Sequence, residues 1–406
     1  MLRQVEVTKR NSPAFKASMS EGSFFGELAL LDRTDKRTAT VTAATDVVCY
    51  FLTRSAFAQV VTGDVADIVK STSAQRAKKM DGVHVKIPFG ELKTLAVLGA
   101  GTFGRVSLVQ NSKDTGQVFA LKALHKSEIV QHKQESNVMN EKNIMIMCHH
   151  PFILRLFDTY KDSHKLYMLL EFCPGGELFT VLHTPHKDGV SAAAAKFYCA
   201  GVAMALGYLS DRDIMYRDLK PENMLVDIKG YPKVIDFGFA KVSKAKTYTL
   251  CGTPEYMAPE IILGRGYDKG VDWWAFGVLL YECLAGYSPF CDPVAMNQQV
   301  ICQNIVAGRL KFPRSNFDSS SKDFIRSLLS MQSAARPGMG PLGSAQVLED
   351  KYFDKFDFSA YTRRELPAPW LPPVKSATDT SHFDPADVDN SVDSSYRDKS
   401  DWDRDF

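Results

Sequence analysis

The chain has 406 residues, which is enough for two or three domains that each bury a core of their own. Its net charge of +2 gives no argument for binding nucleic acid or a membrane surface, although residues 379–406 hold nine Asp and only three Lys or Arg. The eight cysteines form no CxxC pair, and no apolar run approaches the ~20 residues that a membrane span needs. Without a secretory signal, this composition predicts free thiols in a soluble, cytoplasmic protein.

An early segment, residues 21–41, suggests a ligand pocket. It reads EGSFFGELALLDRTDKRTATV and places Arg37 ten positions after Glu27 of the pair Gly26-Glu27. A carboxylate beside a glycine, with a distant arginine, suits a ligand that has both a hydroxyl group and a negative charge. The alternative is that Gly26-Glu27 only starts a short helix and that Arg37 is a surface charge.

Strand patterns and then helical patterns follow along the chain. Residues 38–53 are rich in β-branched and aromatic residues and predict two strands. A helical pattern then runs to a basic end near Asp81, where we place a domain boundary. Three strand patterns lie between Leu92 and Leu124, and helical patterns dominate beyond them, with strand pairs in KLYMLLEF and NMLVDIKGYPKVIDF. After Phe353 a Pro-rich and then Asp- and Ser-rich stretch predicts an extended or partly disordered tail.

A glycine loop lies between the first two of these strands. The stretch LGAGTFGRVSLV places Gly99, Gly101 and Gly104 in a GxGxxGxV pattern. Glycines let the backbone approach phosphate oxygens and offer N–H donors without side-chain bulk. Because the loop leads into a strand and not into a helix, it excludes a dinucleotide-binding fold. On this pattern alone, a glycine-rich hairpin without a ligand remains the commoner alternative.

Two charged residues fall on apolar faces. In VFALKAL, strand alternation puts Lys122 on the face of Ala120, and nineteen residues later helical spacing puts Glu141 in line with Val138 and Met145. A buried charge is costly unless it is paired. A solvated strand lysine and a misread helix face are the alternatives. An ion pair between Lys122 and Glu141 accounts for both positions, and we predict that pair.

The stretches MYRDLKPENMLVD and VIDFGFA supply the chemistry of phosphoryl transfer. This reaction needs a carboxylate that positions a hydroxyl and accepts its proton, oxygen ligands for Mg²⁺, and a cation over the γ-phosphate. Asp218 fits the first role, Asn223 and Asp236 fit the second, and Lys220 fits the third. Either Asp alone would more often be a cap or a turn former. The two motifs together, 18 residues apart and downstream of the glycine loop, favour the catalytic interpretation.

From Leu92 to about Phe353 the chain resembles a eukaryotic protein kinase, on the motifs GAGTFGRV, FALK, YRDLKPEN, DFG and TPEYMAPE. The resemblance implies that Lys122 binds the α- and β-phosphates of ATP, anchored by Glu141, and that Asp218 is the catalytic base. It implies Mg²⁺ ligation by Asn223 and Asp236, and it makes Leu170 the residue at the back of the adenine pocket. Lys220 and GTPEY are typical of serine/threonine kinases. The residues expected to line the ATP site are Leu98, Gly99, Ala100, Gly101, Thr102, Phe103, Gly104, Arg105, Val106, Ala120, Lys122, Glu171, Cys173, Glu177 and Phe383.

Further motifs resemble the AGC group of kinases. Tyr216 stands in place of the usual His of the catalytic loop, and DFGFAK and TLCGTPEY follow. In the tail, DTSHFDP places Phe383 where AGC kinases pack against adenine. The closing DWDRDF is similar to the C-terminus of cGMP-dependent protein kinases, and as in that family no Phe-x-x-Phe motif stands near the end of the chain. By the same resemblance, Asp272 of DWWAFG supports the catalytic loop.

The resemblance also implies two charge pairings in the C-terminal half of the kinase. Thr249, in KTYTLCGT, matches the position that such kinases phosphorylate. A phosphate there would pair with Arg217 and with Lys241 and would order the loop. Glu260 of APE would pair with Arg336.

The resemblance implies a basic peptide as substrate. Glu177 in PGGELF, Glu222 in the catalytic loop and Glu282 in LLYECLAG match positions that contact basic residues before the target hydroxyl. Each of them could instead be a plain structural acid. Their joint occurrence favours protein substrates with basic residues before Ser or Thr.

The early stretch FFGELALLDRTDKRTATV resembles the phosphate-binding cassette of cyclic-nucleotide-binding domains. By this resemblance Glu27 binds the ribose 2′-OH, Gly26 allows close approach, and Arg37 binds the cyclic phosphate together with the backbone N–H of Ala39. Thr38 would favour guanine, and therefore cGMP over cAMP. Only RQVEVTKR reads as a strand before the cassette. We therefore expect a partial β-barrel in a fragment or shortened isoform, with binding of cGMP left open.

The sequence predicts an α+β chain in three parts: a partial β-barrel cyclic-nucleotide-binding domain (1–80), a two-lobed kinase domain with a β-rich N-lobe and a helical C-lobe (92–353), and an AGC-type tail (354–406). The expected function is that of a cGMP-dependent-type serine/threonine kinase that uses ATP and Mg²⁺. One alternative is a kinase that cyclic nucleotides no longer regulate. The other is a cyclic-nucleotide sensor or scaffold with a silent kinase fold, against which the complete set of catalytic residues argues.

Overall fold

The chain separates into two compact units, Met1–Val85 and Lys86–Phe406. A computed structural model provides the structure. It describes the residues 4–9, 12–20, 40–43, 48, 87–184, 188–291, 297–313, 316–383, 396 and 400–406.

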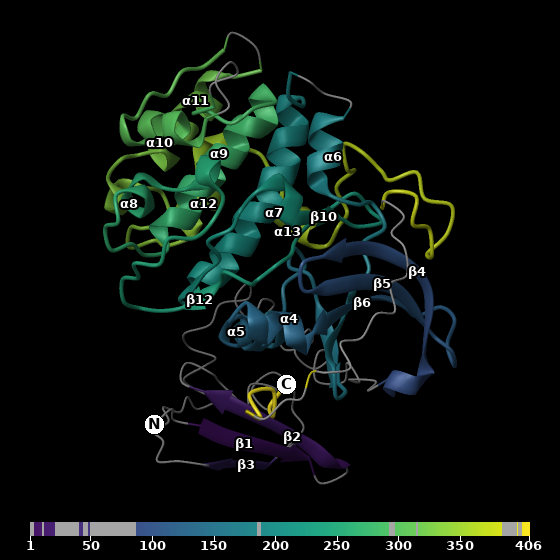
Figure 1. The fold of residues 1–406 in the computed structure, drawn as a ribbon. Helices are drawn as coiled ribbons and strands as arrows, with labels where there is room; N and C mark the ends of the chain where they lie inside the picture. The colour runs from purple at the N-terminus through teal and green to yellow at the C-terminus, as the bar shows by residue number, and fades with distance from the viewer. Residues whose placement is uncertain are drawn as a thin grey trace, which may run out of the picture. The chain divides into compact units, whose positions relative to one another are not determined.

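The first unit contains a three-stranded antiparallel sheet in the order β2-β1-β3 (Figure 1). Its strands are β1 (Gln4–Lys9), β2 (Ser12–Ser20) and β3 (Thr40–Ala43). The prediction of a single strand before the cassette was wrong, because β2 also precedes it. SPAFKASMS lacks the β-branched residues that mark a strand, so β2 depends on pairing with β1. The cassette residues Gly26, Glu27, Arg37, Thr38 and Ala39, and the helix expected before Asp81, lie outside the described residues.

The second unit begins with a β-rich N-lobe, as predicted. Five antiparallel strands form a sheet in the order β4-β5-β6-β8-β7 (Figure 1). The helices α4 and α5 follow β6 in the chain, and α4 contacts β6 while α5 contacts β7. The bounds are β4 (Leu92–Gly101), β5 (Gly104–Asn111), β6 (Val118–His125), α4 (Lys126–Gln131), α5 (Glu135–Met147), β7 (Leu156–Lys161) and β8 (Lys165–Glu171).

The C-lobe is mainly helical and also contains short strand pairs. The strand β9 pairs with β12, and β10 pairs with β11. The strands are β9 (Ile214–Met215), β10 (Met224–Val226), β11 (Pro232–Val234) and β12 (Lys241–Val242). The helices are α6 (Leu178–His183), α7 (Ala192–Ser210), α8 (Pro259–Ile262), α9 (Gly270–Ala285), α10 (Gln298–Val306), α11 (Ser319–Leu328), α12 (Ala345–Leu348) and α13 (Phe358–Thr362).

Helices α7 and α9 form the centre of the C-lobe. All sixteen residues of α9 are buried, and α7 packs against it. By length and composition alone α7 could cross a membrane, which differs from our expectation that no run of the chain is apolar enough. Most of α7 is buried inside the described C-lobe, as in the core helix of a folded domain. Its start is fixed by Ser191, whose hydroxyl accepts from the N–H of Ala194, and α9 ends at Gly286 with a φ of 80°.

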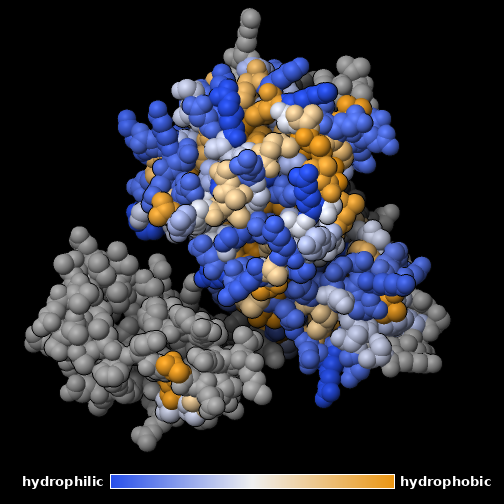
Figure 2. Space-filling model, turned by 90° about the vertical axis from the view of Figure 1, so that its left-hand side faces the viewer, coloured by the Kyte–Doolittle hydropathy of each residue, from blue (hydrophilic) through white to orange (hydrophobic). Residues whose placement is uncertain are grey.

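The cysteines of the described residues are all free, as the composition predicted. Figure 2 shows that hydrophilic side chains cover much of one face of the second unit, with apolar side chains gathered more in its helical part. Exposed apolar residues there include Leu263, Met331 and Leu342. Scattered apolar residues of this kind are normal on a folded domain.

Candidate active site

The glycine loop joins β4 and β5 at the edge of the N-lobe sheet. Carbons added at Gly99 or Gly101 would meet nothing within 4 Å, so both face open space. A carbon at Gly104 would lie 1.9 Å from the carbonyl oxygen of Ala123 on β6, so only glycine fits there. Two of the three glycines therefore leave room for a ligand, and the third lets β5 approach β6.

Lys122 on β6 and Glu141 on α5 form the predicted ion pair. The Nζ of Lys122 lies 2.8 Å from Oε1 of Glu141, and Glu141 is 5% exposed. Burial alone would lower the pKa of Lys122, but the carboxylates of Glu141 and Asp236 outweigh it and raise this pKa above its ordinary value. Lys122 is therefore a fixed cation throughout the neutral pH range.

Asp218 lies at the centre of a hydrogen-bond network in the catalytic loop, and it is 6% exposed. Its Oδ2 accepts from Nδ2 of Asn223 at 2.6 Å and lies 3.4 Å from Nζ of Lys220. Its Oδ1 accepts from the hydroxyl of Thr253 at 3.3 Å, and that hydroxyl accepts from Lys220 at 3.1 Å. In the sequence, Thr253 stands within GTPEY, and no local pattern there predicts a contact with Asp218. Its contacts hold the catalytic carboxylate and the lysine together.

The oxygen atoms needed for a divalent cation come from two loops. Asn223 ends a short 3-10 helix (Pro221–Asn223), and both hydrogen bonds that its amide nitrogen makes go to Asp218, which leaves its oxygen as the ligand atom. Asp236 follows β11 with a φ of 58° and accepts from the N–H of Gly238 at 3.0 Å. Within the described part of the chain, no three His, Cys, Asp or Glu residues cluster as a metal cage. A site with so few protein ligands fits Mg²⁺, which keeps waters and substrate phosphates as its other ligands.

The residues expected to line the adenine pocket come from the N-lobe sheet, from the segment after β8 and from the tail. Leu98, Ala120 and Cys173 are buried in the core, and Ala120 is paired in register with Leu170 of β8. The ring of Phe383, from the tail, lies 5.8 Å from the ring of Phe172 in the hinge, residues 171–173 between β8 and the C-lobe.

The hinge itself is tied to the C-lobe by an ion pair. Glu171 accepts from the buried Nζ of Lys233 on β11 at 2.7 Å. The glutamate is therefore held between the lobes.

Asp272 of α9 binds the backbone at the start of the catalytic loop. Its two carboxylate oxygens accept from the backbone N–H groups of Tyr216 and Arg217, both at 2.8 Å. Tyr216 is fully buried, its hydroxyl donates to the carbonyl of Ile235, and its ring packs edge-on against Phe237. These contacts link α9, the catalytic loop and the DFG segment.

The buried position of Asp272 predicts a pH-dependent stability. Burial raises its pKa to about 6, against the lowering effect of the N–H groups of Arg217 and Tyr216. Between about pH 4 and pH 6 the folded state therefore binds the proton more tightly than the unfolded state, and stability is lost as the pH rises through this range. Relative to Asp272→Asn, the native chain should lose about 1 kcal/mol of unfolding free energy from pH 5 to pH 6 and none from pH 7 to pH 8. Urea denaturation of both proteins at these pH values measures their free energies of unfolding. A difference between the two proteins that does not change with pH would contradict the raised pKa of Asp272.

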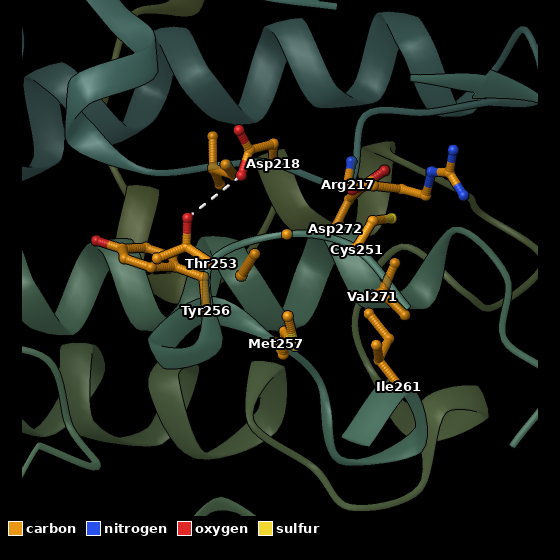
Figure 3. A pocket seen from close by; sticks show the side chains of 12 residues that line it. Arg217, Asp218, Cys251, Thr253, Tyr256, Met257, Ile261, Val271 and Asp272 are labelled. Carbon is orange, nitrogen blue, oxygen red and sulfur yellow. Dashed lines mark hydrogen bonds between the residues drawn. The ribbon is translucent and has the colours of Figure 1, made fainter. Parts of the chain in front are cut away.

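A small cavity of about 10 Å³ lies beneath the catalytic loop (Figure 3). Asp218, Cys251, Thr253 and Asp272 are among its lining residues. Figure 3 shows the Thr253 hydroxyl directed at the Asp218 carboxylate, with the guanidinium of Arg217 directed away from it. The space is no larger than one water molecule. It belongs to the packing under the loop and is too small for a nucleotide or a peptide.

Arg217 and Lys241 both reach the segment that carries Thr249. The hydroxyl of Tyr267 donates to the carbonyl of Thr249 at 2.6 Å and accepts from Arg217 at 3.2 Å. Lys241 donates to the hydroxyl of Thr247 at 2.9 Å. The side chain of Thr249 is exposed, with these two cations held close to its segment.

The three acids expected to meet a basic substrate differ in exposure. Glu177 and Glu222 are exposed, whereas Glu282 is 8% exposed. Glu255, which the sequence analysis did not single out, joins this group: burial, then Glu282 and Glu222, raise the pKa of its carboxyl. Glu222, Glu255 and Glu282 are called the acidic cluster below.

The C-terminal segment packs on the N-lobe. Trp402 and Phe406 contact the hydrophobic core of the kinase unit, although no Phe-x-x-Phe motif stands near the end of the chain. Asp403 is 5% exposed and lies 2.5 Å from Nζ of the equally buried Lys126, the first residue of α4. Lys161 on β7 donates to the carbonyl of Asp403 at 2.6 Å. The end of the tail is thus fixed to β7 and to α4, the helix that precedes α5 with Glu141.

Removing this buried charge should destabilise the kinase unit. We expect Asp403→Asn to lower the free energy of unfolding by about 2 kcal/mol, because the buried Lys126 would lose the negative charge of Asp403 and keep uncharged oxygens, such as the carbonyl of Asp162, as its partners. The exposed Asp405 offers a matched control, and Asp405→Asn should change stability by less than about 0.5 kcal/mol. Equal effects of the two variants in denaturant titrations would contradict this account.

The site is of the protein kinase class. It combines a glycine loop, a lysine paired with a helix carboxylate, and a catalytic Asp with an Asn and a DFG Asp. The sequence matches the protein kinase domain over residues 92–353 and the cyclic nucleotide-binding domain over residues 4–64. The chain belongs to the protein kinase family, within the AGC group, and its N-lobe, C-lobe and preceding cyclic nucleotide-binding domain agree with the predicted fold class.

Its relatives include cyclic-nucleotide-dependent kinases. Over 402 residues it is 39% identical to the cGMP-dependent protein kinase, isozyme 2 forms cD5/T2, of Drosophila melanogaster. The matched region covers 97% of this chain and 42% of that protein. It is 43% identical to the cAMP-dependent protein kinase catalytic subunit of Dictyostelium discoideum, over 76% of this chain and 47% of that protein. It is also 43% identical to the human cAMP-dependent protein kinase catalytic subunit PRKX, over 72% of this chain and 80% of that protein. The chain spans less than half the length of the first two relatives.

Proposed function

We propose that this chain transfers the γ-phosphoryl group of ATP to Ser or Thr of protein substrates. The observation that carries the proposal is the convergence of Asp218, Lys220 and Thr253 on one network, with Asn223 and Asp236 offering oxygen ligands nearby. All of these groups serve positioning and charge stabilisation, which are what phosphoryl transfer requires of a protein.

In this proposal each side chain has one task. Asp218 orients the substrate hydroxyl and accepts its proton, with its carboxylate held in place by Asn223 and Thr253. Lys220 places a positive charge over the transferred group, and Lys122 holds the other phosphates with Glu141 fixing its position. Mg²⁺ at Asn223 and Asp236 would neutralise the charge of the phosphates.

We further propose that the substrates carry basic residues before the target hydroxyl. The acidic cluster and Glu177 support this, because several carboxylates near the catalytic loop favour a cationic peptide. A peptide panel that compares basic, acidic and proline-directed sequences tests it. Preference for acidic or proline-directed peptides would contradict the proposal.

Regulation by a cyclic nucleotide, cGMP over cAMP, is the second part of the proposal. The match of residues 4–64 to the cyclic nucleotide-binding domain supports it, together with Glu27, Arg37 and Thr38 in the sequence of the cassette. The test is ³²P transfer to a basic Ser peptide with Mg-ATP, with and without cGMP or cAMP. Transfer that is indifferent to both nucleotides would favour an unregulated kinase, and no transfer would favour a scaffold.

We propose that phosphorylation of Thr249 activates the enzyme. We expect Thr249→Ala to lower kcat by about tenfold or more, because the phosphate would add at least one strong bond to Arg217 or Lys241. The neighbouring Tyr248 is 72% exposed, and Tyr248→Phe is the matched control that should retain activity. Mass spectrometry of the purified protein locates the phosphate. Full activity of Thr249→Ala would rule this role out.

A further inference from the structure

The carboxylate of Glu282 is already occupied within the acidic cluster. Its side chain is 9% exposed, its Oε2 accepts from the hydroxyl of Tyr256, and its Oε1 lies 2.9 Å from Nε2 of His183. An incoming cation of the substrate therefore has to share Glu282 with these partners. Tyr256 is buried and neutral, because burial and then Glu282 raise the pKa of its hydroxyl well above the ordinary value. His183 is the partner whose charge can change.

His183 is held in this position by its own helix. It is the last residue of α6, its side chain is 20% exposed, and its ring centre lies 4.5 Å from that of Phe179, with the two planes tilted by 38°. The three acids of the cluster come from three elements: Glu282, which faces His183, from α9, Glu222 from the 3-10 helix Pro221–Asn223, and Glu255 from the 3-10 helix Pro254–Tyr256. Among the described residues, no Lys or Arg forms an ion pair with any of these three acids. Within the described part of the chain, the imidazole is thus a candidate cation for this cluster.

The charge of an imidazole changes within the physiological pH range. A neutral His183 that carries its proton on Nε2 donates one hydrogen bond to Glu282 and leaves the negative charge of the cluster unchanged. An imidazolium makes the same hydrogen bond but cancels one negative charge beside a group that has little contact with water. The same geometry therefore presents two different charges to a substrate.

We propose that His183 is a specificity-determining residue, whose charge sets how strongly the acidic cluster holds an arginine of the substrate. The inference rests on the proposed function, because it concerns the same peptide site. As the pH falls, protonation of His183 weakens the binding of basic peptides and leaves neutral peptides unaffected. The difference in affinity between basic and neutral peptides therefore becomes smaller at acidic pH.

The test is a binding measurement on the full chain. The first labelled peptide has two Arg before an Ala that replaces the target Ser, and the second has citrulline in place of both Arg. The Kd of each peptide is measured in the presence of Mg²⁺ and a non-hydrolysable ATP analogue. Between about pH 8 and pH 6, the Kd of the arginine peptide should rise about fivefold more than that of the citrulline peptide. In His183→Gln, which retains a hydrogen-bond donor without a titrating charge, that difference should fall below about twofold.

Two further variants make the result specific. His183→Lys supplies a permanent cation and should bind the arginine peptide weakly at every pH. His164→Gln, in the turn between β7 and β8, removes a histidine outside the acidic cluster and should keep the native pH dependence. A native pH dependence in both His183 variants, or an equal change for the citrulline peptide, would overturn the inference. Binding in the expected pattern without any phosphate transfer would instead contradict the proposed activity and leave the assignment of His183 in place.

Discussion

Asp218→Asn is expected to lower kcat by about 10²- to 10⁴-fold while the KM values for ATP and peptide stay within about threefold of the native values. Asn has the shape of Asp and can still accept from Asn223 and bond with Thr253, so the loop geometry should persist. An amide cannot accept the proton of the substrate hydroxyl, and the loss should therefore appear in kcat.

The control is a carboxylate of the same lobe that has no part in the site. Asp211 is exposed and accepts from the hydroxyl of Ser344 at 3.2 Å, so Asp211→Asn should keep native kinetics. Thermal unfolding of both variants shows whether the fold is intact. If a well-folded Asp218→Asn retained more than about a tenth of the native kcat, Asp218 would not be the base.

The second large effect is expected on stability, from Glu260→Gln. The side chain of Arg336 is fully buried, and Glu260 binds both of its terminal nitrogens, at 2.6 and 2.8 Å. The guanidinium also donates to the carbonyls of Gly270 and Ser330 and lies over the ring of Trp274. Removing the carboxylate would leave a buried charge without a counter-charge. We expect a loss of about 3 to 5 kcal/mol in the free energy of unfolding.

An exposed pair of the same kind provides the comparison. Arg326 and Asp323 lie one helical turn apart on α11, and both are largely exposed. A guanidinium nitrogen of Arg326 lies 2.9 Å from Oδ1 of Asp323. Asp323→Asn should cost less than about 1 kcal/mol. Urea titration of the two variants measures the difference. A cost below about 1 kcal/mol for Glu260→Gln would show that the buried pair does not stabilise the C-lobe.

The sequence was most informative where a charge interrupted an apolar pattern. Lys122 and Glu141 each fell on a face that should be buried, and only a pair between them satisfied both, which the structure contains. Short motifs with fixed spacing located Asp218, Asn223 and Asp236 for a similar reason, since the chemistry requires those residue types together.

The parts that sequence reasoning missed depend on contacts between distant segments. Thr253 lies 35 residues from Asp218, and His183 lies 99 residues from Glu282, with no local pattern that would pair them. The docking of Asp403 on Lys126 joins segments that are even farther apart in the chain. Strand β2 was missed because its residues have weak strand propensity and its pairing with β1 decides its conformation.

The measurement that tests the central proposal most directly is transfer of ³²P from the γ-position of ATP to a serine peptide with preceding arginines, with Mg²⁺ present. The native chain and Asp218→Asn are assayed side by side at equal concentration, and phosphoamino acid analysis identifies the modified residue. The account predicts labelled phosphoserine with the native chain and, with the variant, a rate lower by about 10²-fold or more. Absence of transfer by a folded native chain, or equal transfer by both proteins, would contradict it.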